Sequence, residues 1–308
     1  MCAIRTILHP TDLSESARPA LRLAQNLARE HGARLVVLNV FCPPVVYGEM
    51  GVVMPLPEVA EQLMLGRRVQ LEDYVADSGA ELLVEQGMDA PEILRHAREL
   101  ACDLIVMGTH GRGGVARALL GSVATEVLRH APCPVLAVRS AAGGARPGVP
   151  PGTAGDVAAS RPLFPVILHP TDFSEGSRRA FDIACMLARG GGRLIVLHVE
   201  QVVHVASEEY EGLLEERLRG FESDDPTVRV EHKLREGDLA VEILGEASAS
   251  SCDLIALGTH GRTGLERILM GSVAEAVLRH AGCPVLVVKA PVHAASPEHP
   301  ASSATALP

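Results

Sequence analysis

Two stretches of the sequence share a glycine spacing that is suited to holding phosphate groups. One runs from Gly108 to Ser122 and the other from Gly258 to Ser272, and both read Gly, two residues, Gly, nine residues, Gly-Ser. Because glycine lacks a Cβ atom, backbone N–H groups can approach phosphate oxygens closely. Each closing Gly-Ser opens a predicted helix, whose free N–H groups and positive dipole end attract an anion. The spacing therefore predicts a phosphate-binding loop in each half of the chain.

A purely structural interpretation of these loops stays open. Glycines also make turns, and Ser122 and Ser272 could simply be helix N-caps, with Glu275 completing a capping box in the second loop. Neither loop is a Walker A sequence, because no Gly-Lys-Ser/Thr occurs, and neither is a dinucleotide G-x-G-x-x-G. The same spacing in both halves favours phosphate binding, and capping and binding can coexist.

The charged residues inside the loops add donors without making a catalytic site. Arg112 and Arg262 could supply positive charge, and His110 and His260 could donate to a phosphate or serve as acids. No carboxylate that would activate either histidine can be identified. The chain also lacks the H-E-x-x-H metal spacing and the G-x-S-x-G elbow. The sequence therefore assigns no catalytic residue and no metal site.

Two further pairs of polar residues are expected to be structural. His9 and His169 each precede a proline at the end of a predicted strand. Asp103 and Asp253 each precede an apolar strand, and we expect them to cap the backbone or to pair with arginine.

The whole chain repeats itself, which establishes an internal duplication. We predict a first domain at residues 1–140, a flexible linker rich in Ala, Gly and Pro at 141–162, a second domain at 163–290 and a disordered tail at 291–308. The segments that recur in the same order are Ile7–Glu15 as Ile167–Glu175, Arg34–Val40 as Arg193–Val199, Cys102–Arg112 as Cys252–Arg262, and Val127–Leu136 as Val277–Leu286.

Each half alternates short apolar strands with helical stretches, which indicates an α/β fold with a doubly wound parallel sheet. One predicted helix begins at Ser14 and ends at Gly32, and another is capped by Asp89. Ligands of such sheets bind beyond the carboxyl ends of the strands. The predicted strands of the first half are Ile4–His9, Leu35–Val40, Leu82–Gln86, Leu104–Met107 and Val135–Val138.

The composition argues against several classes of protein. The 308 residues carry a formal net charge of −10 and contain no Trp, so neither a basic surface nor aromatic platforms for nucleic acid are expected. No apolar run reaches the roughly 18 residues of a membrane span, and the start lacks the apolar region of a secretory signal. The seven cysteines include no C-x-x-C pair, so we expect free thiols and a cytoplasmic protein.

The glycine loop, together with a first strand that ends in Pro-Thr-Asp-x-Ser, resembles the ATP-binding class of the universal stress protein family. The resemblance covers nearly the whole chain as a tandem two-domain member. It implies a Rossmann-like, adenine nucleotide alpha hydrolase-like fold, with five parallel strands per domain and helices on both faces. It also implies that the two domains pair through their last strands, Val135–Val138 and Val285–Val288.

The resemblance also implies which residues bind the nucleotide. Asp12 and Asp172 would hold the adenosine end, Val40 and Val199 would contact adenine, and the loop residues would line the phosphates. Since neither copy has lost a glycine or the aspartate, we expect two occupied sites. The predicted residues are Pro10, Thr11, Asp12, Val40, Gly108, Gly111, Arg112, Gly121, Ser122 and Val123 in the first half, and Pro170, Thr171, Asp172, Val199, Gly258, Gly261, Arg262, Gly271, Ser272 and Val273 in the second.

The expected function is that of an ATP-binding regulatory protein of the stress response. The expected ligand is ATP, with or without Mg²⁺. The two domains are expected to form an intramolecular pseudo-dimer, and a homodimer of two chains stays open. Two other classes also stay open: a slow ATPase or ATP-dependent adenylating enzyme, and a nucleotide-free interaction scaffold. The first half alone carries an insertion at residues 41–57, which is either a tolerated surface loop or a flap or partner contact.

Overall fold

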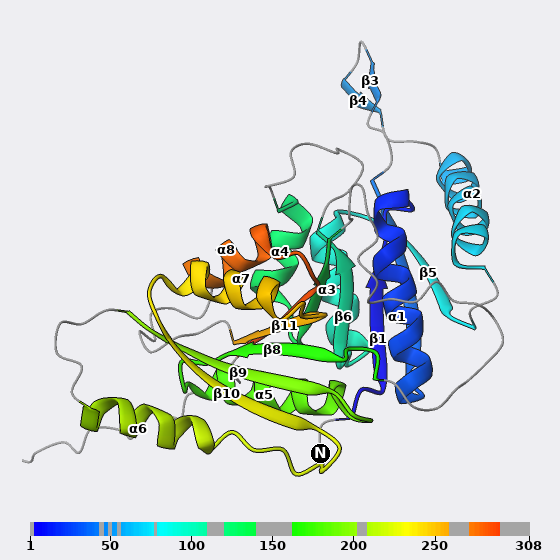
Figure 1. Cartoon of the computed structure of the whole chain (residues 1–308). Helices are drawn as coiled ribbons and strands as arrows, with labels where there is room; N and C mark the ends of the chain where they lie inside the picture. The colour runs from blue at the N-terminus through cyan, green and yellow to red at the C-terminus, as the bar shows by residue number, and fades with distance from the viewer. Residues whose placement is uncertain are drawn as a thin grey trace, which may run out of the picture.

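The structure is a computed structural model that describes residues 3–42, 46–48, 51–53, 57–76, 79–109, 120–139, 162–201, 208–258 and 271–289. Its centre is a ten-stranded sheet in the order β10-β9-β8-β11-β12-β7-β6-β1-β2-β5 (Figure 1). Each half of the chain supplies five neighbouring strands, which run parallel to one another. The fold is therefore the predicted Rossmann-like α/β arrangement, present twice.

The elements of the two halves correspond one to one, apart from a short hairpin and a 3₁₀ turn in the first. The first half contains β1 (Thr6–Pro10), η1 (Glu15–Ala17), α1 (Arg18–His31), β2 (Arg34–Phe41), β3 (Val46–Gly48), β4 (Gly51–Val53), α2 (Pro57–Val75), β5 (Glu81–Gln86), α3 (Asp89–Glu99), β6 (Leu104–Gly108), α4 (Ser122–His130) and β7 (Val135–Val138). The second half contains β8 (Val166–Pro170), α5 (Glu175–Leu187), β9 (Arg193–Glu200), α6 (Glu208–Arg219), β10 (Arg229–Glu236), α7 (Leu239–Ala249), β11 (Leu254–Gly258), α8 (Ser272–His280) and β12 (Val285–Val288).

The inner strands are apolar on both faces because helices cover both faces of the sheet, whereas the edge strand β10 reads RVEHKLRE and is half-buried or exposed along its length. On one face Ile7 and Val37 pack with α1 and α5, and on the other Leu8 and Ile105 pack with α3, α4, α7 and α8. Both clusters continue through the two halves of the chain. This two-sided burial explains why the strands read as continuous apolar runs rather than as alternating patterns.

The strand order reverses beside the first strand of each half. The chain proceeds from β1 to β2 and β5 on one side, and then returns to β6 and β7 on the other. In open α/β sheets, ligands bind in the crevice at such a switch point, beyond the carboxyl ends of the strands. The crevice between β1 and β6, and its counterpart between β8 and β11, are therefore the places to look for a site.

The predicted helix ends are correct in some places and wrong in others. Helix α1 ends at Gly32, whose φ of 61° is left-handed and suits glycine. Ser174 caps α5 by accepting from the N–H of Ser177, but Ser14 makes no such cap and is followed by a 3₁₀ turn. Asp89 is the first residue of α3 rather than its cap, since Met88 occupies that position.

The two halves join through their last strands, as the family resemblance implies. Strands β7 and β12 pair antiparallel, with Leu136 opposite Leu286. Lys289 follows β12 and donates to the carbonyls of Arg129 and Ala131 at the end of α4, at 2.6 and 3.1 Å. Arg139 follows β7 and donates in the same way to a carbonyl at the end of α8. Each half thus places a cation at the negative end of the other half's last helix.

The insertion at residues 41–57 contains a small hairpin formed by β3 and β4 (Figure 1). It belongs to a separate two-stranded sheet and projects away from the ten-stranded one. The predicted linker (141–162) and tail (291–308) lie outside the described residues, except for position 162. Among the described helices, none combines the length and apolar character needed to cross a membrane.

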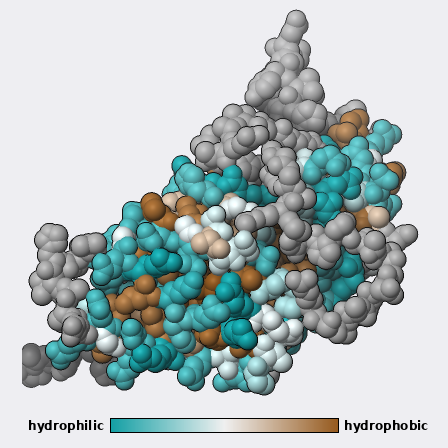
Figure 2. All heavy atoms as spheres, in the orientation of Figure 1, coloured by the Kyte–Doolittle hydropathy of each residue, from teal (hydrophilic) through white to brown (hydrophobic). Residues whose placement is uncertain are grey.

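The surface offers no single apolar band on the face turned toward the viewer (Figure 2). Hydrophobic residues there form separate patches between hydrophilic ones. Exposed apolar side chains include Leu65 on α2 and Val241 on α7, which are 65% and 64% exposed. Scattered exposure of this kind is ordinary for folded proteins.

Candidate functional site

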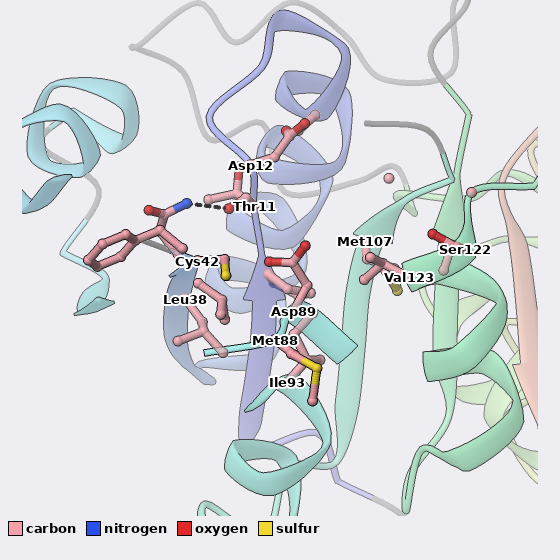
Figure 3. A pocket seen from close by; sticks show the side chains of 18 of the residues that line it. Thr11, Asp12, Leu38, Cys42, Met88, Asp89, Ile93, Met107, Ser122 and Val123 are labelled. Carbon is pink, nitrogen blue, oxygen red and sulfur yellow. Dashed lines mark hydrogen bonds between the residues drawn. The ribbon is translucent and has the colours of Figure 1, made fainter. Parts of the chain in front are cut away.

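A cavity of about 810 Å³ lies in the first half at the carboxyl ends of β1, β2 and β6 (Figure 3). Its walls come from the turn after β1, the end of β2, the start of α3 and the start of α4. It occupies the switch point of the strand order, and its size is that of a small-molecule site. The lining residues are Pro10, Thr11, Asp12, Ala17, Leu38, Asn39, Val40, Phe41, Cys42, Arg67, Gly87, Met88, Asp89, Ile93, Met107, Gly108, Thr109, Leu120, Gly121, Ser122, Val123 and Ala124.

The turn after β1 is held in a strained but well-bonded conformation. Leu13 has a φ of 64°, which is unfavourable for a residue with a Cβ. Its N–H donates to Thr11 Oγ1 at 3.1 Å, and the N–H of Ser14 donates to Asp12 Oδ1 at 3.0 Å. The hydroxyl of Ser14 donates to the same carboxylate oxygen at 2.6 Å. These bonds fix the Asp12 carboxylate at the mouth of the crevice.

The turn after β8 in the second half has the same geometry. Phe173 has a φ of 64°, and its N–H donates to Thr171 Oγ1 at 3.0 Å. The N–H of Ser174 donates to Asp172 Oδ1 at 3.0 Å. The same strained turn therefore occurs in both copies, and strain of this kind motivates the hypothesis that the turn is functional.

The second strand of each half supports this turn through a different side chain. Asn39 Nδ2 donates to the carbonyl of Thr11 at 2.8 Å, the bond drawn dashed in Figure 3. In the second half His198 takes that place, with Nδ1 at 2.7 Å from the carbonyl of Thr171. Because the acceptor is a carbonyl, His198 Nδ1 carries the proton.

Apolar side chains from β2 and α3 line one part of the cavity, with the carboxylate of Asp89 beside them (Figure 3). Leu38, Val40, Phe41 and Ile93 line it, together with the sulfur-containing Met88 (Figure 3). Side chains of this kind form walls for a flat ring. Polar side chains come from two further walls: Thr11 and Asp12 from the turn after β1, and Ser122 from the start of α4 (Figure 3).

One wall of the cavity is formed by the start of α4, where the backbone is closely packed. Gly121 is the N-cap of α4 and donates its N–H to the carbonyl of Thr109 at 2.9 Å. A Cβ at Gly121 would lie 3.1 Å from that same carbonyl oxygen. The position therefore favours glycine because the start of the helix and the end of the strand approach each other closely.

The alternative that serines cap these helices is wrong. The N-caps are Gly121 and Gly271, which have no side chain, and no side-chain cap bond is present at either helix. Ser122 and Ser272 are the first helical residues. Glu275 pairs with Arg279 one turn later instead of completing a capping box. The Ser122 side chain lines the cavity.

Gly258, at the end of β11, has a packing reason to be glycine. A Cβ there would lie 2.7 Å from the backbone nitrogen of Ser177 and 2.8 Å from the carbonyl carbon of Gly176. Both neighbours belong to the first turn of α5 and cannot swing aside. The glycine thus lets the strand contact the helix that follows the Thr171–Asp172 turn.

We therefore expect Gly258→Ala to destabilise the protein by about 1–3 kcal/mol, the usual cost of overpacking a rigid contact. Urea unfolding followed by circular dichroism measures this. Gly212→Ala on α6 is the matched control, since nothing lies within 4 Å of its Cβ position. That control should be stabilised by about 0.5–1 kcal/mol through helix propensity. Equal effects of the two variants would contradict the packing account.

The structure brings most of the predicted binding residues of the first half together. Gly111 and Arg112 of the first half, and Gly261 and Arg262 of the second, lie outside the described residues, as do His110 and His260. The described residues of the second half occupy the equivalent places: Pro170, Thr171, Asp172, Val199, Gly258, Gly271, Ser272 and Val273. The first-half residues that line the cavity are Pro10, Thr11, Asp12, Val40, Gly108, Gly121, Ser122 and Val123.

Sequence reasoning missed the outer part of the cavity. Asn39, Phe41, Arg67 and Met88 line it but carry no motif of their own. One rule would have nominated the segment that contains Met88. Parallel strands all end at the same edge of a sheet, so residues that follow the third strand must also approach the ligand crevice.

His9 and His169 are fully buried structural residues, as predicted. His9 Nδ1 lies 2.7 Å from the carbonyl of Val106, and His169 Nδ1 lies 2.9 Å from that of Ala256. Burial lowers the pKa of each imidazole from 6.5 to about 4. Each ring is therefore neutral at physiological pH and tethers neighbouring strands.

Asp103 and Asp253 both accept hydrogen bonds from the backbone, as predicted. Asp103 Oδ2 accepts from the N–H groups of Arg5 and Thr6 at 2.8 and 2.9 Å. Asp253 Oδ2 accepts from the N–H of Val166 at 2.9 Å. Both carboxylates therefore fasten the start of the first strand in their half.

One cluster in the described part of the chain has the composition of a metal site but is better explained by ion pairing. Glu85, Glu92 and His96 offer ligand atoms that lie within 4.8 Å of one another. Arg95 lies 2.7 Å from Glu92 and 3.6 Å from Glu85, so a cation already occupies the space between the carboxylates. Among the described residues that line the cavity, Asp12 and Asp89 carry carboxylates.

Comparison with known proteins agrees with this architecture. A universal stress protein of Mycolicibacterium smegmatis is 30% identical over 303 residues, covering 92% of this chain and 96% of the relative. One of Methanocaldococcus jannaschii is 38% identical over 143 residues, covering 42% of this chain and 84% of the relative. The crystal structure of a universal stress protein from Archaeoglobus fulgidus matches with a TM-score of 0.65 at 22% identity, covering 92% of this chain and 96% of that one. This last likeness supports the fold alone.

The sequence model of the Universal stress protein family matches two segments, residues 3–139 and 164–289. These segments coincide with the two five-stranded halves of the sheet. The chain therefore belongs to the universal stress protein family and carries the family's domain twice in tandem.

Proposed function

We propose that this protein is an ATP-binding regulator of the stress response, with a nucleotide site in each copy. One observation carries the proposal: a single cavity joins the strained Thr11–Asp12 turn, an apolar slot and the start of α4. An adenine nucleotide needs an apolar slot for its base, a hydrogen-bonding carboxylate for its ribose and a helix start for its phosphates.

In the proposed complex the adenine lies against Val40 and the neighbouring apolar wall. Asp12 accepts hydrogen bonds from the ribose hydroxyls, since an ionised carboxylate only accepts. Gly108, Gly121 and Ser122 face the phosphates, where the N–H groups and dipole of α4 favour negative charge. Gly111 and Arg112 complete the loop, and Mg²⁺ would bind between the phosphates and a cavity carboxylate.

The second copy is proposed to bind ATP through the equivalent residues. Asp172 and Val199 take the adenosine end, and Gly258, Gly271 and Ser272 take the phosphates. Gly261 and Arg262 complete this loop. The boundaries proposed for the two nucleotide-binding domains are residues 1–140 and 163–290, joined by a linker at 141–162 and followed by a tail at 291–308.

An ATP-hydrolysing or adenylating enzyme is the second candidate, and the cavity favours it less. The titratable residues among the described part of the lining are Asp12, Cys42, Arg67 and Asp89. Asp12 is already engaged by the hydroxyl of Ser14, and Arg67 cannot act as a base. Asp89 is the carboxylate that remains among the described lining residues, and no histidine or lysine accompanies it in that lining, so we propose slow turnover at most. The regulatory role itself rests on family membership, since fold alone does not fix function.

The experiment that tests the proposal is mass spectrometry of the purified protein under native and denaturing conditions. We expect a mass increment equal to ATP in the native spectrum, and free ATP after denaturation. Protein that is free of nucleotide and gives no heat on titration with ATP would rule the proposal out. Rapid, enzyme-dependent release of phosphate would favour the enzymatic alternative instead.

A further inference from the structure

The second copy holds two cysteines side by side at the amino ends of two neighbouring strands. Cys252 and Cys283 each stand two residues before a strand, β11 and β12 respectively, and these strands pair in parallel. Their sulfur atoms lie 3.4 Å apart, although the residues are 31 positions apart in sequence. Both are free thiols, like the other cysteines in the described part of the chain. The two thiols therefore meet at the edge of the sheet that lies opposite the proposed nucleotide site.

The backbone around this pair has the spacing that a disulfide needs. Neighbouring strands lie about 4.7–4.9 Å apart, and a disulfide joins Cα atoms that are about 4.4–6.8 Å apart. The N–H of Cys252 donates to the carbonyl of Ala247 at 3.0 Å, which ties it to the end of α7. The N–H of Ile255 donates to the carbonyl of Pro284 at 3.1 Å. These bonds hold the two segments next to each other, so side-chain rotation and a small shift of the chain suffice to join the sulfurs.

One of the two thiols can be reached from solvent. Cys252 is buried, with 4% of its surface exposed, whereas Cys283 is half-buried. Cys283 follows Gly282, which is exposed and whose Cβ position is open. A small oxidant can therefore approach Cys283, and Cys252 lies behind it in the place of a resolving thiol.

The first copy has cysteines at the same two places, but they are poorly suited to react. Cys102 and Cys133 also stand two residues before their strands, β6 and β7. Burial raises the pKa of Cys102 to about 11, and burial together with the neighbouring Cys102 raises the pKa of Cys133 to about 12. Since the thiolate is the nucleophile, both thiols are unreactive near neutral pH. Pro132 also stands where the second copy has Gly282, and it restricts the backbone beside Cys133.

We propose that Cys252 and Cys283 form a reversible disulfide when the protein meets a hydroperoxide such as hydrogen peroxide. The Cys283 thiolate attacks one peroxide oxygen, the O–O bond breaks, and the departing hydroxide leaves as water with the proton that the thiol released. The sulfur of Cys252 then attacks the sulfenic acid on Cys283. The S–S bond forms, the S–O bond breaks, and the hydroxide leaves as water with the Cys252 proton. Two thiols thus pass two electrons to one peroxide, and a dithiol reductant restores them by exchange.

The disulfide would close a loop of chain that runs from the start of β11 to the start of β12. This loop contains the second glycine spacing, Gly258 to Ser272, and it ends at the strand that pairs with β7 of the first copy. Closing a loop of this length stabilises a protein mainly by restricting its unfolded chain. We therefore expect oxidation to raise the Tm by about 5 °C.

Peroxide treatment, alkylation of the remaining free thiols, digestion with trypsin and mass spectrometry test the disulfide. Trypsin separates the two cysteines into the peptides 236–262 and 280–289. We expect oxidation to join these peptides with the loss of two hydrogen atoms, and dithiothreitol to separate them again. The intact chain should show the higher Tm only in the oxidised state. Since this peptide map uses the natural chain, it needs no variant to fold.

Two variants assign the effect to the pair. Cys283→Ala should abolish both the joined peptides and the rise in Tm. Cys133→Ala, at the equivalent place in the first copy, is the matched control and should keep both.

Four results would overturn the proposal. The first is oxidation of Cys283 to sulfinic acid without a joined peptide, and the second is a disulfide that links two chains, seen by non-reducing electrophoresis. The third is a rise in Tm that survives Cys283→Ala. The fourth is equal joining of the peptides 99–112 and 130–139, which carry Cys102 and Cys133. None of these measurements involves ATP, so the proposal and the proposed function stand or fall separately.

Discussion

Substituting Gly121 by valine should remove one ATP per chain, and substituting Gly271 should remove the other. Gly121 already sits against the strand that precedes the loop, because a Cβ there would lie 3.1 Å from the Thr109 carbonyl oxygen. Valine adds two methyl groups beyond that Cβ, at the point where backbone N–H groups would meet phosphate. Gly271 has the same conformation, with φ of −59° and ψ of 147° against −61° and 150° at Gly121.

The test is the number of ATP molecules bound per chain, measured by calorimetry at saturating ATP. The natural chain should bind two ATP, each single variant one, and the double variant none, while circular dichroism shows all four folded. Gly245→Val is the matched control, because its Cβ position on α7 is open, and it should keep both ATP molecules. A double variant that still binds ATP would exclude the loops as the phosphate site. If Gly271→Val left the stoichiometry unchanged, the second copy would be a structural partner only.

Acid should destabilise this protein through two buried histidines between pH 6.5 and pH 4. Burial lowers the pKa of His9 and His169 from 6.5 to about 4, so the folded state binds protons less readily than the unfolded chain. Neutral imidazole therefore contributes stability above pH 6.5, and this contribution is lost as the pH falls through the folded pKa. At about 1.4 kcal/mol per pKa unit, each ring is worth about 3 kcal/mol.

The test is the free energy of unfolding in urea as a function of pH. His9→Asn with His169→Asn removes the titration but keeps an N–H donor for the carbonyls that the rings contact. The double variant should lose about 6 kcal/mol less than the natural chain between pH 6.5 and pH 4. His130→Gln, on the exposed end of α4, is the control for replacing a histidine that is not buried. Parallel curves for the double variant and the natural chain would disprove the assignment.

The parts of the fold that could be predicted are those whose sequence pattern occurs in both copies. Val135–Val138 is predicted to the residue, because a short apolar run between Pro and Arg has only one way to fit a buried strand. The ends of other strands move by one or two residues, as for β1, which runs to Pro10. The apolar sequence pattern locates the buried middle of a strand well. The ends of a strand depend on its hydrogen bonds to the neighbouring strands, which the pattern does not show.

The polar half of the site could also be predicted, and the apolar half could not. Glycine spacing and the Asp12 turn are local in sequence, so they appear as motifs. Phe41 and Met88 reach the cavity only because β2 and β5 end side by side, which sequence does not display. Serine at a helix start was misleading, since Gly121 takes the N-cap position and leaves Ser122 inside the helix.

The pairing of β7 with β12 has a consequence for how the chain is made. During synthesis, β7 leaves the ribosome about 150 residues before its partner strand does. Since chains are synthesised at about 5–20 residues per second, the apolar edge strand β7 remains unpaired for roughly 8–30 s before β12 emerges. Throughout that interval the nascent chain offers an open parallel sheet to other chains on the same polysome. Because both copies lie on one chain, β7 is expected to pair with β12 of the same chain. This requires that the β7 edge stays protected until the second copy emerges.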